Sequence, residues 1–126
     1  PSVFNHNETV KLICIGGIYD NRSGGVLGSE VIKSISKYIF SKGFVGSAGV
    51  NLTTNSAYTL TLEDGNVKEV IISNSKEAFL LVEKEKFDAD STYKFADLEE
   101  FNAIITDSDI SERIRNRIQK LSVKLI

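Results

Sequence analysis

The sequence is poor in proline and has no long hydrophobic run. Among its 126 residues the only proline is Pro1, where average usage would give about six. This scarcity excludes a proline-stiffened linker and a collagen-like repeat. The longest apolar runs, such as 78–82, are about a quarter of the roughly 20 residues that cross a bilayer, and no basic and then apolar secretory segment opens the chain. We therefore expect a soluble, cytoplasmic protein with no membrane partner.

The chain is also poor in cysteine and lacks an excess of positive charge. Its single cysteine, Cys14, lies in the apolar run 10–15, where a lone thiol is usually a small buried hydrophobe. This excludes disulfide scaffolds and cysteine-rich metal sites, and we predict no cofactor and no metal ion. Lys and Arg total 15 against 17 Asp and Glu, so the net charge is −2. The chain therefore lacks the basic field that holds a DNA backbone.

Short apolar runs rich in β-branched residues alternate with longer stretches of helical period. This alternation predicts an α/β domain with a mostly parallel sheet flanked by helices. One run, 78–82, is uninterrupted, so we expect its strand to be buried on both faces. The predicted strands are 10–15, 43–46, 78–82, 92–95, 102–106 and 123–126.

Three helices are predicted from apolar residues at steps of three and four. The first covers 29–40. The second has an apolar face that begins at Val67, and Asp64 is its expected cap. The third follows the capping-box spacing of 109–112. The small polar residues of 47–56 predict a loop.

The ligand site of an open α/β sheet lies at the carboxyl ends of its strands. Glycines that allow close backbone approach, together with the charge of Lys86, suit a small anion such as a phosphorylated metabolite. Spacing alone leaves simpler interpretations open: the glycines can be plain turns, Lys86 can be solvated, and 106–108 can serve only to cap the last helix. The strand ends in question are 16–17, 47–49, 83–86 and 106–107.

Five short segments, in order along the chain, carry a family resemblance. They are CIGGIY (14–19), GFVGSAGVNLTT (43–54), VK (67–68), FLLVEKEKF (79–87) and IITD (104–107). They resemble the C-terminal effector-sensing domain of DeoR-family bacterial repressors of sugar metabolism, over nearly the whole chain. The resemblance implies the fold type shared with ribose-5-phosphate isomerase and CoA transferases. It also implies that a bound sugar phosphate alters the DNA affinity of an N-terminal winged helix-turn-helix domain.

The same resemblance implies a set of ligand-binding residues. The best single candidate is Lys86, as a charge partner for a ligand phosphate or hydroxyl. Aspartates common in the family are replaced here by Ser41, Glu83 and Asn51, so the identity of the sugar is not predicted. The position of the isomerases' general base is matched by Val67, which cannot take a proton, so no catalytic residue is implied. The implied ligand-binding residues are Gly16, Gly17, Ser47, Gly49, Asn51, Lys68 and Lys86.

The resemblance further implies that 1–126 is a single sensing domain that lacks its N-terminal part. In family members the DNA-binding domain and the first part of the sensor, with a Gly-Thr-Thr-like loop, precede the strand at 10–15. The expected partners are a phosphorylated sugar, further copies of the chain in a homo-oligomer, and DNA only through the N-terminal domain. Two alternatives stay open: a sugar-phosphate isomerase-like enzyme on the same fold, and a unit whose chief role is oligomerisation.

Overall fold

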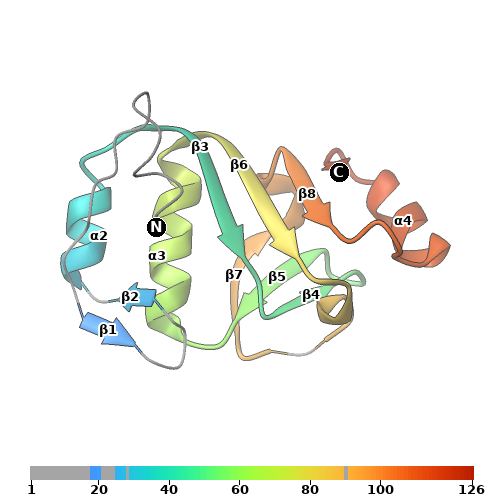
Figure 1. Cartoon of the computed structure of the whole chain (residues 1–126), viewed down its shortest axis with the longest axis horizontal. Coiled ribbons are helices and arrows are strands. Elements are labelled where there is room, and N and C mark those ends of the chain that lie inside the picture. Colours follow the sequence, from blue (N-terminus) through green and yellow to red (C-terminus); the bar gives the residue numbers. More distant parts are fainter. Residues whose placement is uncertain (1–17, 21–24, 28, 90) are drawn as a thin grey trace, which may run out of the picture.

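A computed structural model of the chain describes residues 18–20, 25–27, 29–89 and 91–126, and it confirms the α/β class (Figure 1). The central sheet has four parallel strands in the order β3-β6-β8-β9, and a second sheet has three antiparallel strands in the order β4-β5-β7. The elements are β1 (Ile18–Asp20), β2 (Gly25–Leu27), α2 (Ser29–Ile35), β3 (Phe40–Gly46), β4 (Gly49–Asn51), β5 (Ser56–Thr59), α3 (Leu62–Ser73), β6 (Ser75–Val82), the 3-10 helix η1 (Lys84–Lys86), β7 (Tyr93–Asp97), the 3-10 helix η2 (Leu98–Glu100), β8 (Ala103–Thr106), α4 (Glu112–Gln119) and β9 (Lys124–Leu125).

The central sheet buries one face in the main hydrophobic core. Val45 of β3, Leu80 of β6 and Ile104 of β8 are almost fully buried in one cluster with Ile118 of α4. The prediction that 78–82 is buried on both faces is wrong, because Leu81 is 41% exposed. Side chains of a strand alternate between the two faces, and only alternate residues of β6 reach this core. The predicted strands 92–95, 102–106 and 123–126 are confirmed as β7, β8 and β9.

The second sheet contains residues that the sequence predicted as a loop. Residues 47–56 include β4 and the first residue of β5, and Val50 and Ala57 are fully buried where these strands pair. The Asn51 carboxamide oxygen accepts hydrogen bonds from the amides of Thr53 and Thr54, and Asn55 has a positive φ of 55°. Asparagine is common in turns, because its side chain accepts hydrogen bonds from nearby backbone amides and its backbone tolerates a positive φ. The polar residues therefore form a tight turn between two short strands.

Helix α3 begins earlier than predicted, because its N-cap is Thr61 rather than Asp64. The Thr61 side chain accepts a hydrogen bond from the Asp64 amide at 3.2 Å. Asp64 is therefore in the first turn, where a carboxylate interacts favourably with the positive end of the helix dipole. The glycine that follows it lies against another element: a Cβ at Gly65 would be 2.6 Å from the Tyr93 ring of β7. The missing side chain lets α3 and β7 approach closely.

Two further element boundaries differ from the prediction. Helix α2 ends at Ile35 instead of continuing to residue 40, because the Phe40 amide donates to the Asn74 carbonyl and starts β3. Helix α4 begins after Ser111, whose hydroxyl accepts from the Ile114 amide at 3.2 Å. The prediction that residue 109 starts the capping motif of this helix is therefore wrong. The predicted strand at 10–15 lies outside the described residues.

Candidate functional site

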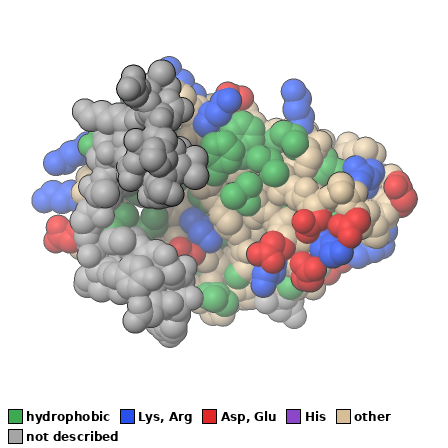
Figure 2. All heavy atoms as spheres, in the orientation of Figure 1, with side chains coloured by type: hydrophobic (Ala, Val, Ile, Leu, Met, Phe, Trp, Pro, Cys, Tyr) green, Lys and Arg blue, Asp and Glu red, His purple; other side chains and the backbone are tan. Residues whose placement is uncertain are grey.

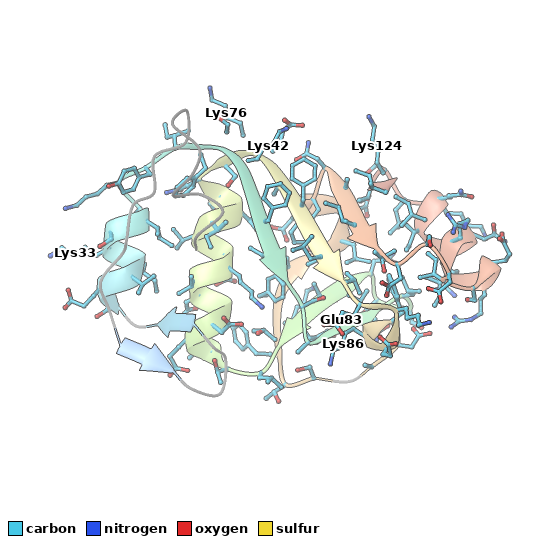
Figure 3. The ribbon with its side chains drawn as sticks, in the orientation of Figure 1. Lys33, Lys42, Lys76, Glu83, Lys86 and Lys124 are labelled. Carbon is cyan, nitrogen blue, oxygen red and sulfur yellow. The ribbon has the colours of Figure 1, made fainter. Side chains whose placement is uncertain are left out.

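The carboxyl ends of β3 and β6 open into a groove of about 800 Å³. The end of β5, the first turns of α3 and the η1 segment complete its walls. Glu83 and Lys86 lie at this end of the sheet, and Lys42, Lys76 and Lys124 lie at the opposite end (Figure 3). The volume falls in the range of about 300–1,000 Å³ typical of small-molecule sites. The parallel topology thus forms a candidate ligand site at the edge that the sequence predicted.

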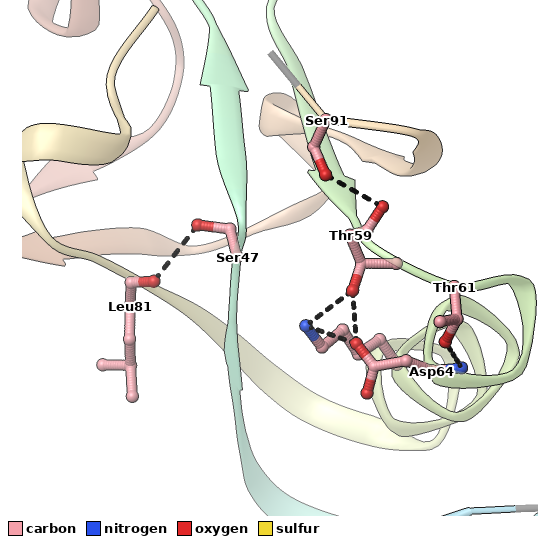
Figure 4. A network of polar contacts seen from close by, with 7 residues as sticks. Ser47, Thr59, Thr61, Asp64, Leu81 and Ser91 are labelled. Atoms are coloured by element: carbon pink, nitrogen blue, oxygen red, sulfur yellow. Dashed lines mark hydrogen bonds and ion pairs between the residues drawn. The ribbon is translucent and has the colours of Figure 1, made fainter. Parts of the chain in front are cut away.

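One wall of the groove is a polar network that includes Thr59, Thr61 and Asp64 (Figure 4), and Lys68 of α3 belongs to it. The Lys68 ammonium lies 2.9 Å from an Asp64 carboxylate oxygen and 3.3 Å from the Thr59 hydroxyl. That hydroxyl donates to the same carboxylate, and the ammonium also lies 5.1 Å from the centroid of the Phe95 ring, a cation–π distance. The Lys68 side chain is only 16% exposed. These contacts hold it in place rather than leaving it solvated.

The opposite wall carries Lys86 at the end of η1. Its side chain is half-buried, and among the residues that the structure describes no carboxylate lies within ion-pair distance of its ammonium. Its backbone is fixed by a hydrogen bond from the Lys86 amide to the Glu83 carbonyl at 2.9 Å. Glu83 itself is exposed at the rim of the groove. The groove is therefore bordered by two lysines, Lys68 and Lys86, that belong to different elements.

The floor between these walls is the chain segment that leaves β3. Ser47 directs its hydroxyl to the Leu81 carbonyl of β6, at 3.3 Å, and the Ala48 amide donates to the Tyr58 carbonyl at 2.9 Å. Ser47 also borders a second depression of about 470 Å³, which continues toward Thr106 and Asp107 at the end of β8. The three predicted strand ends within the described residues thus meet along one edge.

The structure places two other predicted ligand residues, Gly49 and Asn51, away from the groove. Gly49 is buried in β4 opposite Tyr58, and the Asn51 side chain is used in the turn after β4. Gly16 and Gly17 lie outside the described residues. Asp107 accepts a hydrogen bond from the Lys84 amide at 2.8 Å. It therefore ties the loop after β8 to η1, and it does not cap α4.

The residues that line the groove and that sequence reasoning missed include Thr59 and Asp64, which contact Lys68. Thr59 is 2% exposed and its hydroxyl bridges Asp64 and Lys68. Two features of the sequence could have indicated Asp64. Thr61 and Asp64 have the spacing of a capping motif, and Asp64 precedes Lys68 by four residues, which is the spacing of an ion pair on one helix face.

Val67, at the position that the resemblance matches to the isomerases' general base, is buried in a cluster with Val31 and Ile35 of α2, and no proton-transfer group stands at that position.

An exposed ion pair connects η1 to the segment before α4. The Lys84 ammonium lies 2.6 Å from the Asp109 carboxylate. The hydrogen bond and the charge attraction in this pair raise the pKa of Lys84 and lower the pKa of Asp109.

Among the described residues, no group of three or more His, Cys, Asp or Glu side chains could hold a metal ion. No described helix is long and apolar enough to cross a membrane.

Comparison with known proteins identifies the family. The family model described as the DeoR C terminal sensor domain matches residues 2–108. The chain belongs to this family. The lactose phosphotransferase system repressor of Lactococcus lactis is 34% identical over 109 residues, which are 86% of this chain and 42% of that protein. The HTH-type transcriptional repressor GlcR of Bacillus subtilis is 27% identical over 127 aligned positions, 98% of this chain and 47% of that repressor.

A third relative of this DeoR sensor domain is the glycerol-3-phosphate regulon repressor of Escherichia coli, 26% identical over 80% of this chain and 40% of that protein. The chain therefore spans less than half the length of these three curated relatives. All three are named as repressors and none as an enzyme. The family expected from the five sequence segments is confirmed.

Proposed function

We propose that this DeoR sensor domain binds a phosphorylated sugar in the groove at the carboxyl ends of β3 and β6, as the sensing part of a bacterial repressor of sugar-metabolism genes. The observation that carries the proposal is the convergence of Lys68 and Lys86 on one groove beside the Ser47 hydroxyl. The lining also carries the carboxylates of Asp64 and Glu83, so the attraction of an anion in this proposal rests on the Lys86 ammonium and on the nearby hydroxyl groups rather than on an excess of positive charge.

The two lysines have different roles in this proposal. Lys86 has no carboxylate partner among the described side chains, so its ammonium is the first candidate to contact the phosphate. Lys68 is already paired with Asp64, and that pair presents a carboxylate and an ammonium side by side. A sugar hydroxyl can donate to the first and accept from the second. The groove would therefore prefer a sugar phosphate to inorganic phosphate.

The names of two relatives refer to a lactose phosphotransferase system and to a glycerol-3-phosphate regulon. Phosphorylated carbohydrates and polyols are for this reason the ligand class to test first. In the intact protein, ligand binding would favour one packing of the sensor domains and thereby change the arrangement of DNA-binding domains joined to them. DNA contact and homo-oligomer formation belong to that larger protein in this proposal.

The test is isothermal titration calorimetry of the intact protein that contains this chain with hexose 6-phosphates, pentose 5-phosphates and glycerol 3-phosphate. Inorganic phosphate and the unphosphorylated sugars serve as ligand controls. We expect at least one sugar phosphate to bind more tightly than either control. Equal affinity for inorganic phosphate and for every sugar phosphate would contradict the proposal.

Lysine variants then locate the site. Loss of one charged hydrogen bond costs about 1.5–3 kcal/mol, or about 10- to 100-fold in Kd, so we expect Lys86→Met to weaken binding by that factor. Lys33→Met is the matched control, because Lys33 is an exposed lysine of α2 away from the groove (Figure 3). If Lys86→Met and Lys68→Met both bind as the unmodified chain does, the ligand is not in this groove.

A further inference from the structure

Two side-chain hydrogen bonds join the carboxyl ends of β6 and β8 beyond the last backbone pair. The last paired residues of the two strands are Val82 and Thr106. The Thr106 hydroxyl donates to the Val82 carbonyl, and a carboxylate oxygen of Asp107 accepts from the Lys84 amide at 2.8 Å. The two bonds lie on either side of Glu83 in the chain. The end of β8 therefore holds the backbone where it leaves β6 and begins η1.

Asp107 makes a contact that η1 does not make for itself. The first amides of a helix have no partner within the helix, and the side chain of the preceding residue often accepts from one of them. The residue before η1 is Glu83, whose side chain makes no such hydrogen bond. The Lys84 amide is bonded instead to a carboxylate that follows another strand. The start of η1 therefore depends on the end of β8 for its position.

The position of η1 matters because Lys86 is its last residue. Directly after it the chain is anchored again, since Phe87 is buried in the main core and the Asp88 amide donates to the Val50 carbonyl at 2.7 Å. The three residues of η1 are not buried, so packing does not fix them between these two points. The segment is held at its end by the core and at its start by Asp107.

We propose that Asp107 is a positioning residue of the ligand site, which accepts from the Lys84 amide and thereby holds Lys86 where its ammonium meets the ligand phosphate. The proposal rests on the function proposed above, which gives Lys86 its ligand. Asp107 does not line the groove itself, so it acts through η1. When a site is competent for only part of the time, its apparent Kd rises in inverse proportion to the competent fraction. Freeing the start of η1 lowers that fraction.

The contact lies at the surface, where it can be changed without disturbing the core. Asp107 is exposed, and Figure 2 shows acidic and basic side chains gathered over this end of the sheet. Asp107→Ala removes the acceptor, whereas Asp107→Asn keeps an acceptor oxygen and removes only the charge. Asp109→Ala is the matched control, because Asp109 contacts the ammonium of the same Lys84 and not its backbone. Thermal unfolding verifies that each variant folds.

The first measurement is isothermal titration calorimetry of the intact protein and its variants, with the sugar phosphate that the unmodified protein binds most tightly among those named above. We expect Asp107→Ala to raise Kd about fivefold, as when the competent fraction falls to about one fifth. Asp107→Asn keeps the hydrogen bond and Asp109→Ala removes an exposed ion pair, so each should raise Kd less than about twofold. Weakening by Asp107→Asn equal to that by Asp107→Ala would overturn the proposal, because the charge and not the hydrogen bond would then be required.

A double-mutant cycle shows whether Asp107 acts through Lys86. In a Lys86→Met protein, we expect Asp107→Ala to change Kd by less than about twofold, because residues that act as one unit do not have additive effects. The same weakening with and without the Lys86 ammonium would mean that Asp107 acts on the ligand or on the whole fold, which overturns the proposal.

Hydrogen exchange tests the contact without a ligand. Exchange of the peptide that spans residues 83–88 is followed by mass spectrometry. We expect it to be at least about threefold faster in Asp107→Ala and nearly unchanged in Asp107→Asn, since an amide exchanges when its hydrogen bond opens. Unchanged exchange in Asp107→Ala overturns the proposal whether or not a sugar phosphate binds. If the unmodified protein binds no sugar phosphate, the proposed function fails, and the exchange result alone decides whether Asp107 holds η1.

Discussion

The two walls of the groove hold their lysines in different ways. On the α3 wall, Lys68 contacts a carboxylate, a hydroxyl and an aromatic ring, and its side chain is 16% exposed. On the η1 wall, no residue of the 3-10 helix is buried, and its ion pair of Lys84 with Asp109 lies in solvent. The first wall is ordered before any ligand arrives, and the second depends on contacts that water weakens.

This difference indicates how the two walls would contribute to binding. A side chain that is already fixed loses little conformational entropy when a ligand arrives, whereas ordering a rotamer-rich side chain costs about 0.5–1.5 kcal/mol. The α3 wall can therefore supply a precise contact for sugar hydroxyls at low cost. The Lys84–Asp109 pair joins the η1 wall to the segment before α4, and an exposed pair of this kind adds little stability, so the η1 wall can adapt to a ligand at low cost.

The largest expected effect comes from a change that separates the α3 wall from the second sheet. Gly65→Val would place atoms against the Tyr93 ring, where even a Cβ would be 2.6 Å from the nearest ring carbon. Overpacking of this kind costs about 1–3 kcal/mol, and we expect that decrease in the free energy of unfolding in urea. Glu69→Val, at an exposed position of the same helix, is the control and should change stability little. A Gly65→Val protein as stable as the control would show that the wall is not tightly packed.

The second effect tests the contrast between the lysines directly. Lys68→Met leaves Asp64 without its ion-pair partner in a partly buried site. We therefore expect the free energy of unfolding to fall by about 1–2 kcal/mol, which is less than the cost of breaking a fully buried ion pair. Lys86→Met should change stability by less than about 0.5 kcal/mol. Chemical denaturation of the two variants measures both values. Equal losses of stability in the two would remove the distinction between the walls.

The sequence was sufficient to predict the class of fold and the edge of the sheet where the groove lies. Both follow from the alternation of apolar runs and from the rule that parallel strands end at one edge. It was not sufficient for the second sheet, because β4 and β5 are only three and four residues long and the turn between them is polar. Short strands of this kind gain their stability from burial of residues such as Val50, which local pattern does not show.

The same limit applies to the site itself. Lys86 and Ser47 were predicted because they lie just past strand ends and match segments of the family, and the structure places both in the groove with Lys68. Thr59 was missed because its role depends on contact with α3, three-dimensional information that a strand-end rule does not contain. Gly49 and Asn51 share the segment 43–54 with Ser47, yet they face the second sheet and its turn. Proximity in sequence did not translate into proximity in the groove.

A smaller effect is expected from the hydroxyl that links the two charges of the α3 wall. Thr59→Val keeps the shape of the side chain and removes the group that contacts both Asp64 and Lys68. Net loss of such a hydrogen bond costs about 1 kcal/mol, measured as a decrease in the free energy of unfolding. Thr53→Val, in an exposed turn, is the control. If Thr59→Val is as stable as the control, the ion pair alone holds this wall.

The smallest effect belongs to the η1 wall and depends on pH. The pKa of Asp109 is lowered in the folded chain, so its contribution to stability is present above the ordinary aspartate pKa of about 3.9 and is lost as the pH falls through the folded value. The pKa of Lys84 is raised, so its contribution is complete below about pH 10.4 and is lost as the pH rises through the folded value. Between about pH 5 and 9 both groups stay charged, so the pair makes a small and constant contribution to the free energy of unfolding. We therefore expect Asp109→Asn to lower the melting temperature slightly across that range, and the difference from the unmodified chain to shrink at more acidic pH. A difference that does not shrink on acidification would mean that the charge of Asp109 is not what stabilises the contact between η1 and the segment before α4.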